Sequence, residues 1–213
     1  NGIKAFLYST LHSVPQLSFT VLHLGCIAGV VITASHNPPE YNGYKVYWEH
    51  GGQVGPEQAD EILKYIRNAD YFAVKGMDEQ AALSSGIVKM IGAEVDEEYY
   101  KATMSLRLNP EVTAAKGGEM KLVYTPLHGS GCVPVKEILK RIGLCNVSVV
   151  AEQEAPDGSF PTAKSPNPED PAGFALAIEY AKKHDIDFLV GTDPDSDRVG
   201  IVVRDKAGKY VPV

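Results

Sequence analysis

Three aspartates occupy alternate positions, 193, 195 and 197, in the segment LVGTDPDSDRVGIVV. They follow a hydrophobic run that predicts a strand, and in an extended chain residues two apart point to the same side. Carboxylates that converge in this way repel one another unless a cation neutralises them. Oxygen ligands alone favour Mg²⁺, with Mn²⁺ as a substitute, so Asp193, Asp195 and Asp197 are predicted metal ligands. The alternative interpretation is a solvated acidic turn.

A second loop carries nucleophilic and basic groups. The segment VVITASHNPPEYNGYKVY begins as a hydrophobic strand and then exposes Ser35, His36 and, further along, Lys45. Magnesium polarises phosphoryl oxygens, so a serine near a magnesium site is a candidate carrier of a phosphoryl group. A phosphate on Ser35 would add negative charge and acceptor oxygens and would become a fourth metal ligand. Lys45 and His36 would then balance charge or move a proton, while Arg198 would hold a phosphate.

Other mechanisms use some of the same residues. A serine hydrolase would pair Ser35 with His36, but adjacent residues on an extended loop point apart and the G-x-S-x-G turn is missing around this serine. A phosphatase with Asp193 as its nucleophile would explain the aspartates and leave the loop of Ser35 unexplained. A non-catalytic protein that binds a metal or a phosphosugar through the same loops is a further alternative.

Taken together, the two loops resemble those of the α-D-phosphohexomutase superfamily, the phosphoglucomutases and phosphomannomutases. TASHNPPEYNGYK is similar to the phosphoserine loop of that family, and DPDSDR is similar to its metal loop, which more often reads D-G-D-G-D-R. Both motifs occur in the family's order. Pro194 and Ser196, where glycine is commoner, resemble a branch that includes phosphoglucomutases and phosphopentomutases, so a phosphopentomutase is an alternative within the family.

The resemblance implies a reversible transfer of a phosphoryl group between the 1- and 6-positions of a hexose phosphate, glucose or mannose. Ser35 would be the phosphoserine, which donates its phosphoryl group and recovers one from a bisphosphate intermediate, with glucose 1,6-bisphosphate as activator. Mg²⁺ would be bound by the three aspartates together with the phosphate on Ser35. Lys45, the first choice, and His36 would be the general acid and base, and the pKa of a lysine beside a metal and other cations is expected to be lowered.

The resemblance also implies residues that hold the phosphate or the substrate, namely Asn37 and Arg198. His128 and Ser130 belong to the segment LHGSG, which falls between a predicted strand and a predicted helix, where glycine amides and a helix N-terminus could meet an anion. The alternative for this segment is a tight packing turn. Lys164, the only basic residue of PDGSFPTAKSPNPED, is interpreted as part of a solvated loop.

The order of hydrophobic patterns predicts an α/β fold with mainly parallel, mixed sheets flanked by helices. The first strand, helix and strand suggest a right-handed parallel crossover, and the apolar run AGVVITA suggests a strand that is covered on both faces. The Asn109-Pro110 pair and the stretch from 116 to 118 interrupt the periodicity. We therefore predict two α/β domains, residues 1–110 with the phosphoserine loop and residues 111–213 with the metal loop.

Domain organisation in the family gives these two units a context. Its members have four domains, so the resemblance places this chain at the end of the first domain and over the second. The lack of an initiator Met and the strand that has just begun at GKYVPV agree with a fragment. We expect the chain alone to be inactive, because the sugar-selecting and phosphate-clamping loops of the later domains would be absent.

The composition limits the classes of partner. The 213 residues include 44% hydrophobic residues and carry a net charge of −7, which disfavours binding to nucleic acid or to an anionic membrane. Neither a membrane span nor a secretory signal is indicated, so a soluble, cytoplasmic protein with a phosphosugar substrate is expected. Cys26, Cys132 and Cys145 are widely spaced among apolar residues and are predicted to be buried thiols, without disulfides or a zinc site. The sequence does not specify an oligomeric state.

Overall fold

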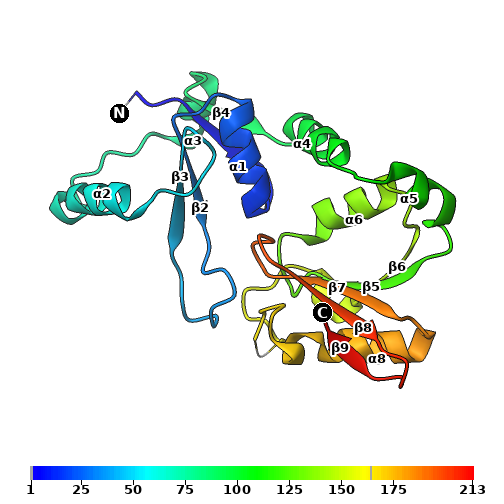
Figure 1. Cartoon of the computed structure of the whole chain (residues 1–213). Helices are drawn as coiled ribbons and strands as arrows, with labels where there is room; N and C mark the ends of the chain where they lie inside the picture. Colours follow the sequence, from blue (N-terminus) through cyan, green and yellow to red (C-terminus); the bar gives the residue numbers. More distant parts are fainter. Residues whose placement is uncertain (1, 164) are drawn as a thin grey trace.

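The computed structural model describes residues 2–163 and 165–213, so Lys164 lies outside the described residues. Helices and strands are interspersed along the chain (Figure 1). The elements of the first half are β1 (Ala5–Tyr8), α1 (Val14–His23), β2 (Ala28–Ile32), β3 (Tyr44–Trp48), α2 (Pro56–Asn68), α3 (Glu79–Ser84), β4 (Val88–Ile91), α4 (Ala93–Ser105) and α5 (Pro110–Lys116). The elements of the second half are β5 (Lys121–Thr125), α6 (Cys132–Arg141), β6 (Asn146–Val149), α7 (Ala151–Glu154), the 3₁₀ helix η1 (Pro171–Phe174), α8 (Ala175–His184), β7 (Phe188–Thr192), β8 (Val199–Arg204) and β9 (Tyr210–Pro212).

The second half is built on a five-stranded mixed sheet in the order β6-β5-β7-β8-β9. β5 runs parallel to β6 and β7, whereas β7 with β8 and β8 with β9 form antiparallel pairs. Helices cover both faces, because Leu122 and Tyr124 pack in the cluster that includes α6, while Val123 packs in the cluster that includes α8. The α/β class predicted from the sequence is confirmed.

The first half pairs its strands differently from the predicted crossover. β1 pairs in parallel with β4, and β2 pairs with β3 in antiparallel fashion, so β1 and β2 belong to separate two-stranded sheets. The predicted parallel crossover from β1 to β2 is therefore wrong. β4 is a four-residue strand too short to show a period of its own, and the partner of β1 depends on this distant segment.

β2 is covered on one face rather than on both. α1 packs against the face of Gly29 and Val31, where a Cβ on Gly29 would lie 2.6 Å from Val21 Cγ2. On the other face, Val30 is 57% exposed and Ile32 is 69% exposed. The prediction of a strand buried on both faces is wrong in this chain, because a two-stranded sheet with a single helix has only one covered face.

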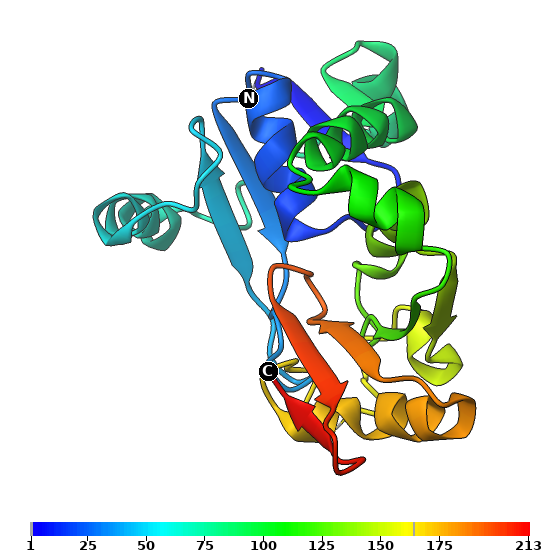
Figure 2. The same cartoon turned by 45° about the vertical axis from the view of Figure 1, so that its right-hand side comes forward.

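A capping box stabilises the start of α1. The Ser13 side chain accepts a hydrogen bond from the Gln16 N–H, the Gln16 side chain accepts one from the Ser13 N–H, and Pro15 stands in the first turn. The loop from β2 to β3 lies beside the second half in both views (Figures 1 and 2), and α1 descends toward the same region. Both halves therefore meet where the two predicted chemical loops lie.

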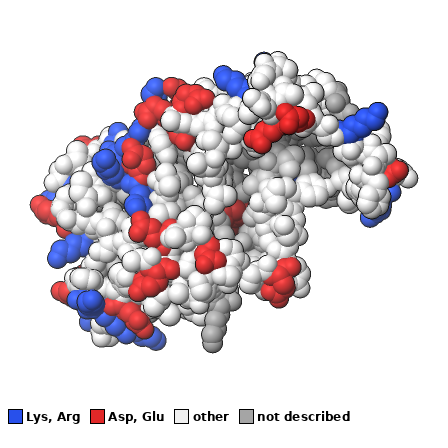
Figure 3. All heavy atoms as spheres, turned by 180° about the vertical axis from the view of Figure 1, so that it is seen from behind, with Lys and Arg blue, Asp and Glu red and all other residues white. Residues whose placement is uncertain are grey.

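Charged side chains are mixed on the surface (Figure 3), and the three cysteines differ in their exposure. On the face shown in Figure 3, acidic and basic side chains are interspersed rather than gathered in one patch. Cys132 is buried, Cys26 is half-buried and Cys145 is exposed, so the prediction of buried thiols is wrong for Cys145. Among the described residues, the helices are too short or too polar for a membrane-spanning segment.

Phe174 lies in the core of the five-stranded sheet, and its replacement tests the assignment of that core. Its side chain is 1% exposed, and its ring lies where a Cβ on Gly191 would be 2.8 Å from Phe174 Cζ. We expect Phe174→Ala to lower the free energy of unfolding by about 3–5 kcal/mol, because the cavity left by a buried ring is only partly refilled. Urea denaturation measures this value. Leu108→Ala, at a position that is 91% exposed, is the control and should change it by less than about 0.5 kcal/mol; equal effects of the two variants would contradict the assigned core.

Candidate active site

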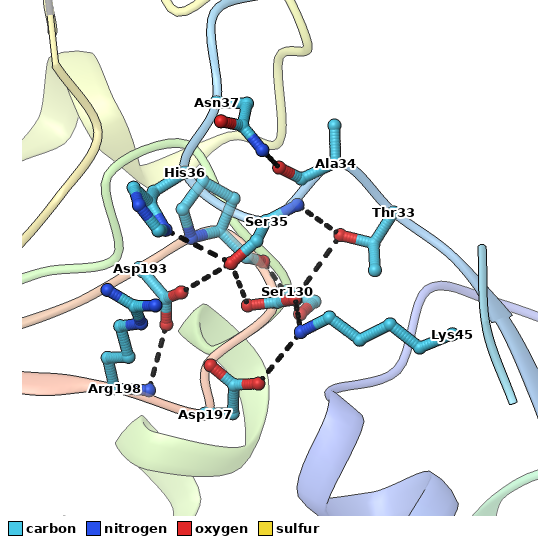
Figure 4. Close-up of polar contacts among 12 residues, drawn as sticks. Thr33, Ala34, Ser35, His36, Asn37, Lys45, Ser130, Asp193, Asp197 and Arg198 are labelled. Carbon is cyan, nitrogen blue, oxygen red and sulfur yellow. Dashed lines mark hydrogen bonds and ion pairs between the residues drawn. The ribbon is translucent and has the colours of Figure 1, made fainter. Parts of the chain in front are cut away.

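The two chemical loops, far apart in the sequence, meet in space. The Ser35 Oγ lies 3.3 Å from Asp193 Oδ2 and 3.4 Å from Asp195 Oδ1 (Figure 4). The Lys45 Nζ lies 2.8 Å from Asp195 Oδ2 and 3.0 Å from Asp197 Oδ2. The structure thus brings the predicted serine and lysine of one loop into contact with all three predicted metal ligands of the other.

The loop of Ser35 turns sharply at that residue. Ser35 has a φ of 55°, in the left-handed region, and its N–H donates to Thr33 Oγ1 at 2.8 Å. The turn brings His36 Nδ1 to 3.2 Å from Ser35 Oγ. The expectation that these two side chains point apart is wrong, because it assumed an extended loop.

Lys45 reaches the site from β3. The antiparallel register pairs Lys45 with Val31, and the Thr33 N–H donates to the Gly43 carbonyl at 3.0 Å to extend the pairing into the loop. The hairpin therefore fixes the lysine beside the loop that begins after β2. Its side chain is 21% exposed, so its ammonium is partly withdrawn from solvent where it meets the carboxylates.

The metal loop joins β7 to β8 as a tight turn. The Asp193 Oδ1 accepts from the Arg198 N–H at 2.9 Å, and the Ser196 N–H donates to the Asp193 carbonyl at 3.0 Å. Ser196 has a φ of 59°. One oxygen from each of Asp193, Asp195 and Asp197 lies within 4.8 Å of the others. The predicted convergence is present, but a folded turn produces it rather than an extended strand.

Burial and mutual contact set the charges of these groups. Burial raises the pKa of the Asp193 carboxyl to about 7, and its hydrogen bond with Asp195 adds to the rise. Burial also acts to raise the pKa of Asp195, but hydrogen bonds from Asp193 and Lys45 hold it below its ordinary value. For Lys45, burial acts to lower the pKa, but hydrogen bonds to Asp195 and Asp197 outweigh this effect and raise it. Two carboxylates surround its ammonium and account for the raised pKa, while the lowered pKa expected for Lys45 beside a bound metal stays a prediction.

The cluster fits a hard divalent cation. All the donor atoms are carboxylate oxygens, two of the aspartates are buried, and their oxygens already lie close together. The raised pKa of Asp193 shows that burial disfavours the fully ionised set without a balancing charge. A second positive charge beside Lys45 would stabilise all three carboxylates in their ionised form.

The side chains of Asn37, Arg198 and His128 have their hydrogen-bond partners outside the cluster of the three aspartates. The Asn37 Nδ2 donates to the Ala34 carbonyl at 2.8 Å within its own loop. The Arg198 guanidinium is directed to Glu169, at 3.4 Å, and is 40% exposed. His128 is buried, and its ring contacts Thr162 Oγ1 at 2.8 Å and the Ala155 carbonyl at 3.3 Å. The structure therefore brings His128 to the segment 155–162 and not to the cluster.

Two groups at the site were not predicted. The Thr33 hydroxyl accepts from Ser35 N–H and donates to Asp195 Oδ2 at 3.3 Å, so it links the two loops. Its position two residues before Ser35 was the signal that could have indicated it. The Val14 N–H, in the first turn of α1, donates to the Asp195 carbonyl at 2.9 Å. This contact has no signal in the sequence, because it joins segments that only the tertiary fold brings together.

Family models match both halves of the chain. Residues 1–72 match "Phosphoglucomutase/phosphomannomutase, alpha/beta/alpha domain I", and residues 97–208 match "Phosphoglucomutase/phosphomannomutase, alpha/beta/alpha domain II". The second match covers more than half of the chain.

Named relatives and solved structures give the same result. A phosphoglucomutase of Staphylococcus saprophyticus is 39% identical over 96% of this chain and 36% of its own length. A "Probable phosphomannomutase" of Haemophilus influenzae is 35% identical over 98% of this chain and 41% of its own length. A crystal structure described as a "putative phosphomannomutase" of Thermus thermophilus superposes with a TM-score of 0.76 and 28% identity, covering 95% of this chain and 42% of that one. The chain spans well under half the length of these proteins.

The raised pKa of Asp193 predicts a pH dependence of metal binding. A cation must displace the proton that Asp193 carries below a pH of about 7. The apparent Mg²⁺ affinity should therefore be constant above this pH and fall by about tenfold for each pH unit below it. Calorimetric titration with Mg²⁺, in buffers of different ionisation enthalpy, measures both the affinity and the released proton.

Asp193→Asn is the matched control for this titration. The variant has no proton to displace at this position, so its weaker Mg²⁺ binding should change much less over the same pH range. Wild-type affinity that is independent of pH below about 7 would contradict either the raised pKa or the role of Asp193 as a ligand.

Proposed function

The chain belongs to the phosphoglucomutase/phosphomannomutase family, and from this premise we propose that the full-length protein that contains it is a phosphosugar mutase. It would move a phosphoryl group reversibly between the 1- and 6-positions of a hexose phosphate, glucose or mannose, through a bisphosphate intermediate. The observation that supports this proposal best is the contact of Ser35 Oγ with Asp193 and Asp195, at 3.3 and 3.4 Å. The site thereby joins a hydroxyl able to carry the phosphoryl group to carboxylates able to hold a cation.

Ser35 would carry the transferred phosphoryl group. A phosphate on its Oγ adds about −1.5 to −2 charges next to three carboxylates, so positive charge must balance it. Lys45 provides one balancing charge at the same carboxylates. Asp193, Asp195 and Asp197 would hold Mg²⁺ together with an oxygen of this phosphate. When bound, the ion would polarise the phosphoryl oxygens and neutralise their charge.

Proton transfer would rest on His36 and Lys45. The sugar hydroxyl must lose a proton as it attacks phosphorus, and Ser35 Oγ must gain one as it leaves. His36 Nδ1, 3.2 Å from Ser35 Oγ, lies within reach of the proton on that atom. Lys45 remains our first choice for the proton of the sugar hydroxyl. Neutralisation of Asp195 and Asp197 would remove the cause of its raised pKa and make its neutral form accessible.

The other predicted residues would support the loops or hold phosphate. Asn37 would stabilise the loop of Ser35 through the Ala34 carbonyl. Arg198 would exchange its ion pair with Glu169 for a substrate phosphate. The exposed Arg198–Glu169 pair, at 3.4 Å, is weak enough to be replaced. For His128 we propose a supporting role in the segment 155–162 rather than direct contact with substrate, because both ring nitrogens already have partners there.

We propose two domains, with a boundary near residue 110, where α5 begins. Since the chain spans 36% to 41% of the curated relatives, we propose that other parts of the full-length protein select the sugar and hold its second phosphate. Glucose 1,6-bisphosphate is the activator that this mechanism requires to phosphorylate Ser35.

The isolated chain is therefore expected to lack mutase activity. Residues 1–213, purified and supplied with Mg²⁺ and glucose 1,6-bisphosphate, should convert glucose 1-phosphate no faster than the buffer does. A coupled assay of glucose 6-phosphate measures the rate, with the full-length protein as the positive control. Robust turnover by the isolated chain would contradict the proposed division of labour.

The proposed donor is tested by peptide mapping of the full-length protein. After incubation with glucose 1,6-bisphosphate and Mg²⁺, the peptide that contains Ser35 should gain a phosphate of about 80 Da. A chase with hexose monophosphate should remove it, and Ser35→Ala should gain no label and lose turnover by several orders of magnitude. Label on Asp193 instead would favour a phosphatase mechanism, and Mg²⁺ binding without any label would favour a binding protein.

A further inference from the structure

The turn 127–131, which joins β5 to α6, lies directly against the metal loop. The Ser130 N–H donates to the Pro194 carbonyl at 2.8 Å, and the Ser130 Oγ donates to the same oxygen at 2.9 Å (Figure 4). A carbonyl oxygen has two lone pairs, so these two donors saturate it. Pro194 stands between Asp193 and Asp195, and the turn therefore holds the backbone between two proposed metal ligands.

The turn 127–131 and the metal loop lie too close together for a side chain at Gly129 or Gly131. A Cβ on Gly129 would lie 2.3 Å from Pro194 Cα, and a Cβ on Gly131 would lie 2.6 Å from Ser196 Oγ and 2.7 Å from Thr192 Oγ1. Glycine at both positions is thus a requirement of space. The backbone of the turn therefore packs directly on the backbone of Pro194 and on the side chains of Thr192 and Ser196.

The turn is itself held firmly from behind. Leu127 and His128 have φ angles of 46° and 61°, a conformation that persists only when surrounding contacts enforce it. Leu127 is fully buried, the His128 N–H donates to the Gln153 carbonyl at 3.0 Å, and the His128 ring has the two partners given above. Ser130 therefore projects from a rigid support.

Asp195 is the ligand that this support affects most. Ser130 fixes the carbonyl of residue 194, and Val14 N–H fixes the carbonyl of residue 195 at 2.9 Å. Both peptide groups that flank the Cα of Asp195 are therefore held in place. Its carboxylate contacts Ser35, Lys45 and Thr33, so its direction decides how the two loops meet.

We propose that Ser130 is a positioning residue of the metal centre, acting through the Pro194 carbonyl on the direction of the Asp195 carboxylate. This inference rests on the proposed function only in taking the three aspartates as Mg²⁺ ligands. Ser130 does not contact the metal or the sugar in this role. Its hydroxyl supplies one of the two donors that hold the loop, and its N–H supplies the other.

Ser130→Ala in the full-length protein tests the proposal. Removal of one of the two donors should lower the Mg²⁺ affinity by about tenfold, the lower end of the range for residues that orient metal ligands. Calorimetry with Mg²⁺ alone measures this affinity and does not depend on turnover. The rate at limiting Mg²⁺ should fall in proportion, kcat should recover toward the wild-type value at saturating Mg²⁺, and KM for the hexose phosphate should stay unchanged.

Two further variants separate positioning from general stability. Ser130→Thr keeps the hydroxyl and should restore Mg²⁺ affinity to within about threefold of wild type. Ser85→Ala removes a comparable hydrogen bond, from Ser85 Oγ to the Ala82 carbonyl at 3.0 Å, at the end of α3, and should leave the affinity unchanged. Wild-type affinity in Ser130→Ala, failure of threonine to restore it, or an equal loss in Ser85→Ala would overturn the proposal. Failure of Ser35 to accept phosphate in the wild-type protein would instead refute the proposed function and leave these affinities interpretable.

Discussion

The ion pairs of Lys45 with Asp195 and Asp197 are the interaction on which the arrangement of the site depends. Two ionised carboxylates whose oxygens lie within 4.8 Å of each other repel by about 3 kcal/mol or more at an effective dielectric constant of about 20, and this site holds three carboxylates. Lys45 offsets part of that repulsion from the opposite loop, at 2.8 and 3.0 Å. The same contacts draw Ser35 to the carboxylates. The ion pairs of Lys45 therefore both balance the charge of the carboxylates and bring Ser35, the proposed phosphoryl donor, next to them.

Contacts among α1, α4 and α6 hold the β2–β3 hairpin next to the β7–β8 hairpin, so that Lys45 can reach the aspartates. Asp96 on α4 accepts hydrogen bonds from His12 and Gln16 at the start of α1, each at 2.9 Å. Next to it, Glu97 pairs with Arg141 of α6 through two hydrogen bonds of 2.9 and 2.7 Å, and the guanidinium lies 4.7 Å over the Tyr100 ring. α4 therefore connects the helix that precedes β2 to the helix that follows the turn of Ser130. A pairing with such fixed geometry orients elements more strictly than apolar packing alone.

The sequence predicted the parts of this site that depend on neighbours in the chain. The spacing of the aspartates and the TASHNP stretch are local patterns, and each lies where it was expected. The pairing of β1 with β4 was not predictable, because the choice of strand partner depends on contacts between distant parts of the chain. The turns at Ser35 and Ser196 were not predicted either, because left-handed backbone replaces the extended chain that alternation assumes. Val14 acts through its backbone N–H, which leaves no pattern in side-chain chemistry, and the Ser130 N–H and hydroxyl meet the Pro194 carbonyl only through the tertiary fold.

The two halves also divide the proposed chemistry. All three proposed metal ligands come from one turn, between β7 and β8, whereas the proposed donor Ser35 and its partner Lys45 come from the β2–β3 hairpin. The metal loop is anchored by Ser130 of the second half and by Val14 of the first half, and Lys45 of the first half contacts two of its carboxylates. Contact with Ser35 is supported in the same way by the contacts of α4 with α1 and α6. On the proposed function, one turn of the second half supplies the three carboxylates, and both cation binding and phosphoryl transfer depend on the interface between the two halves.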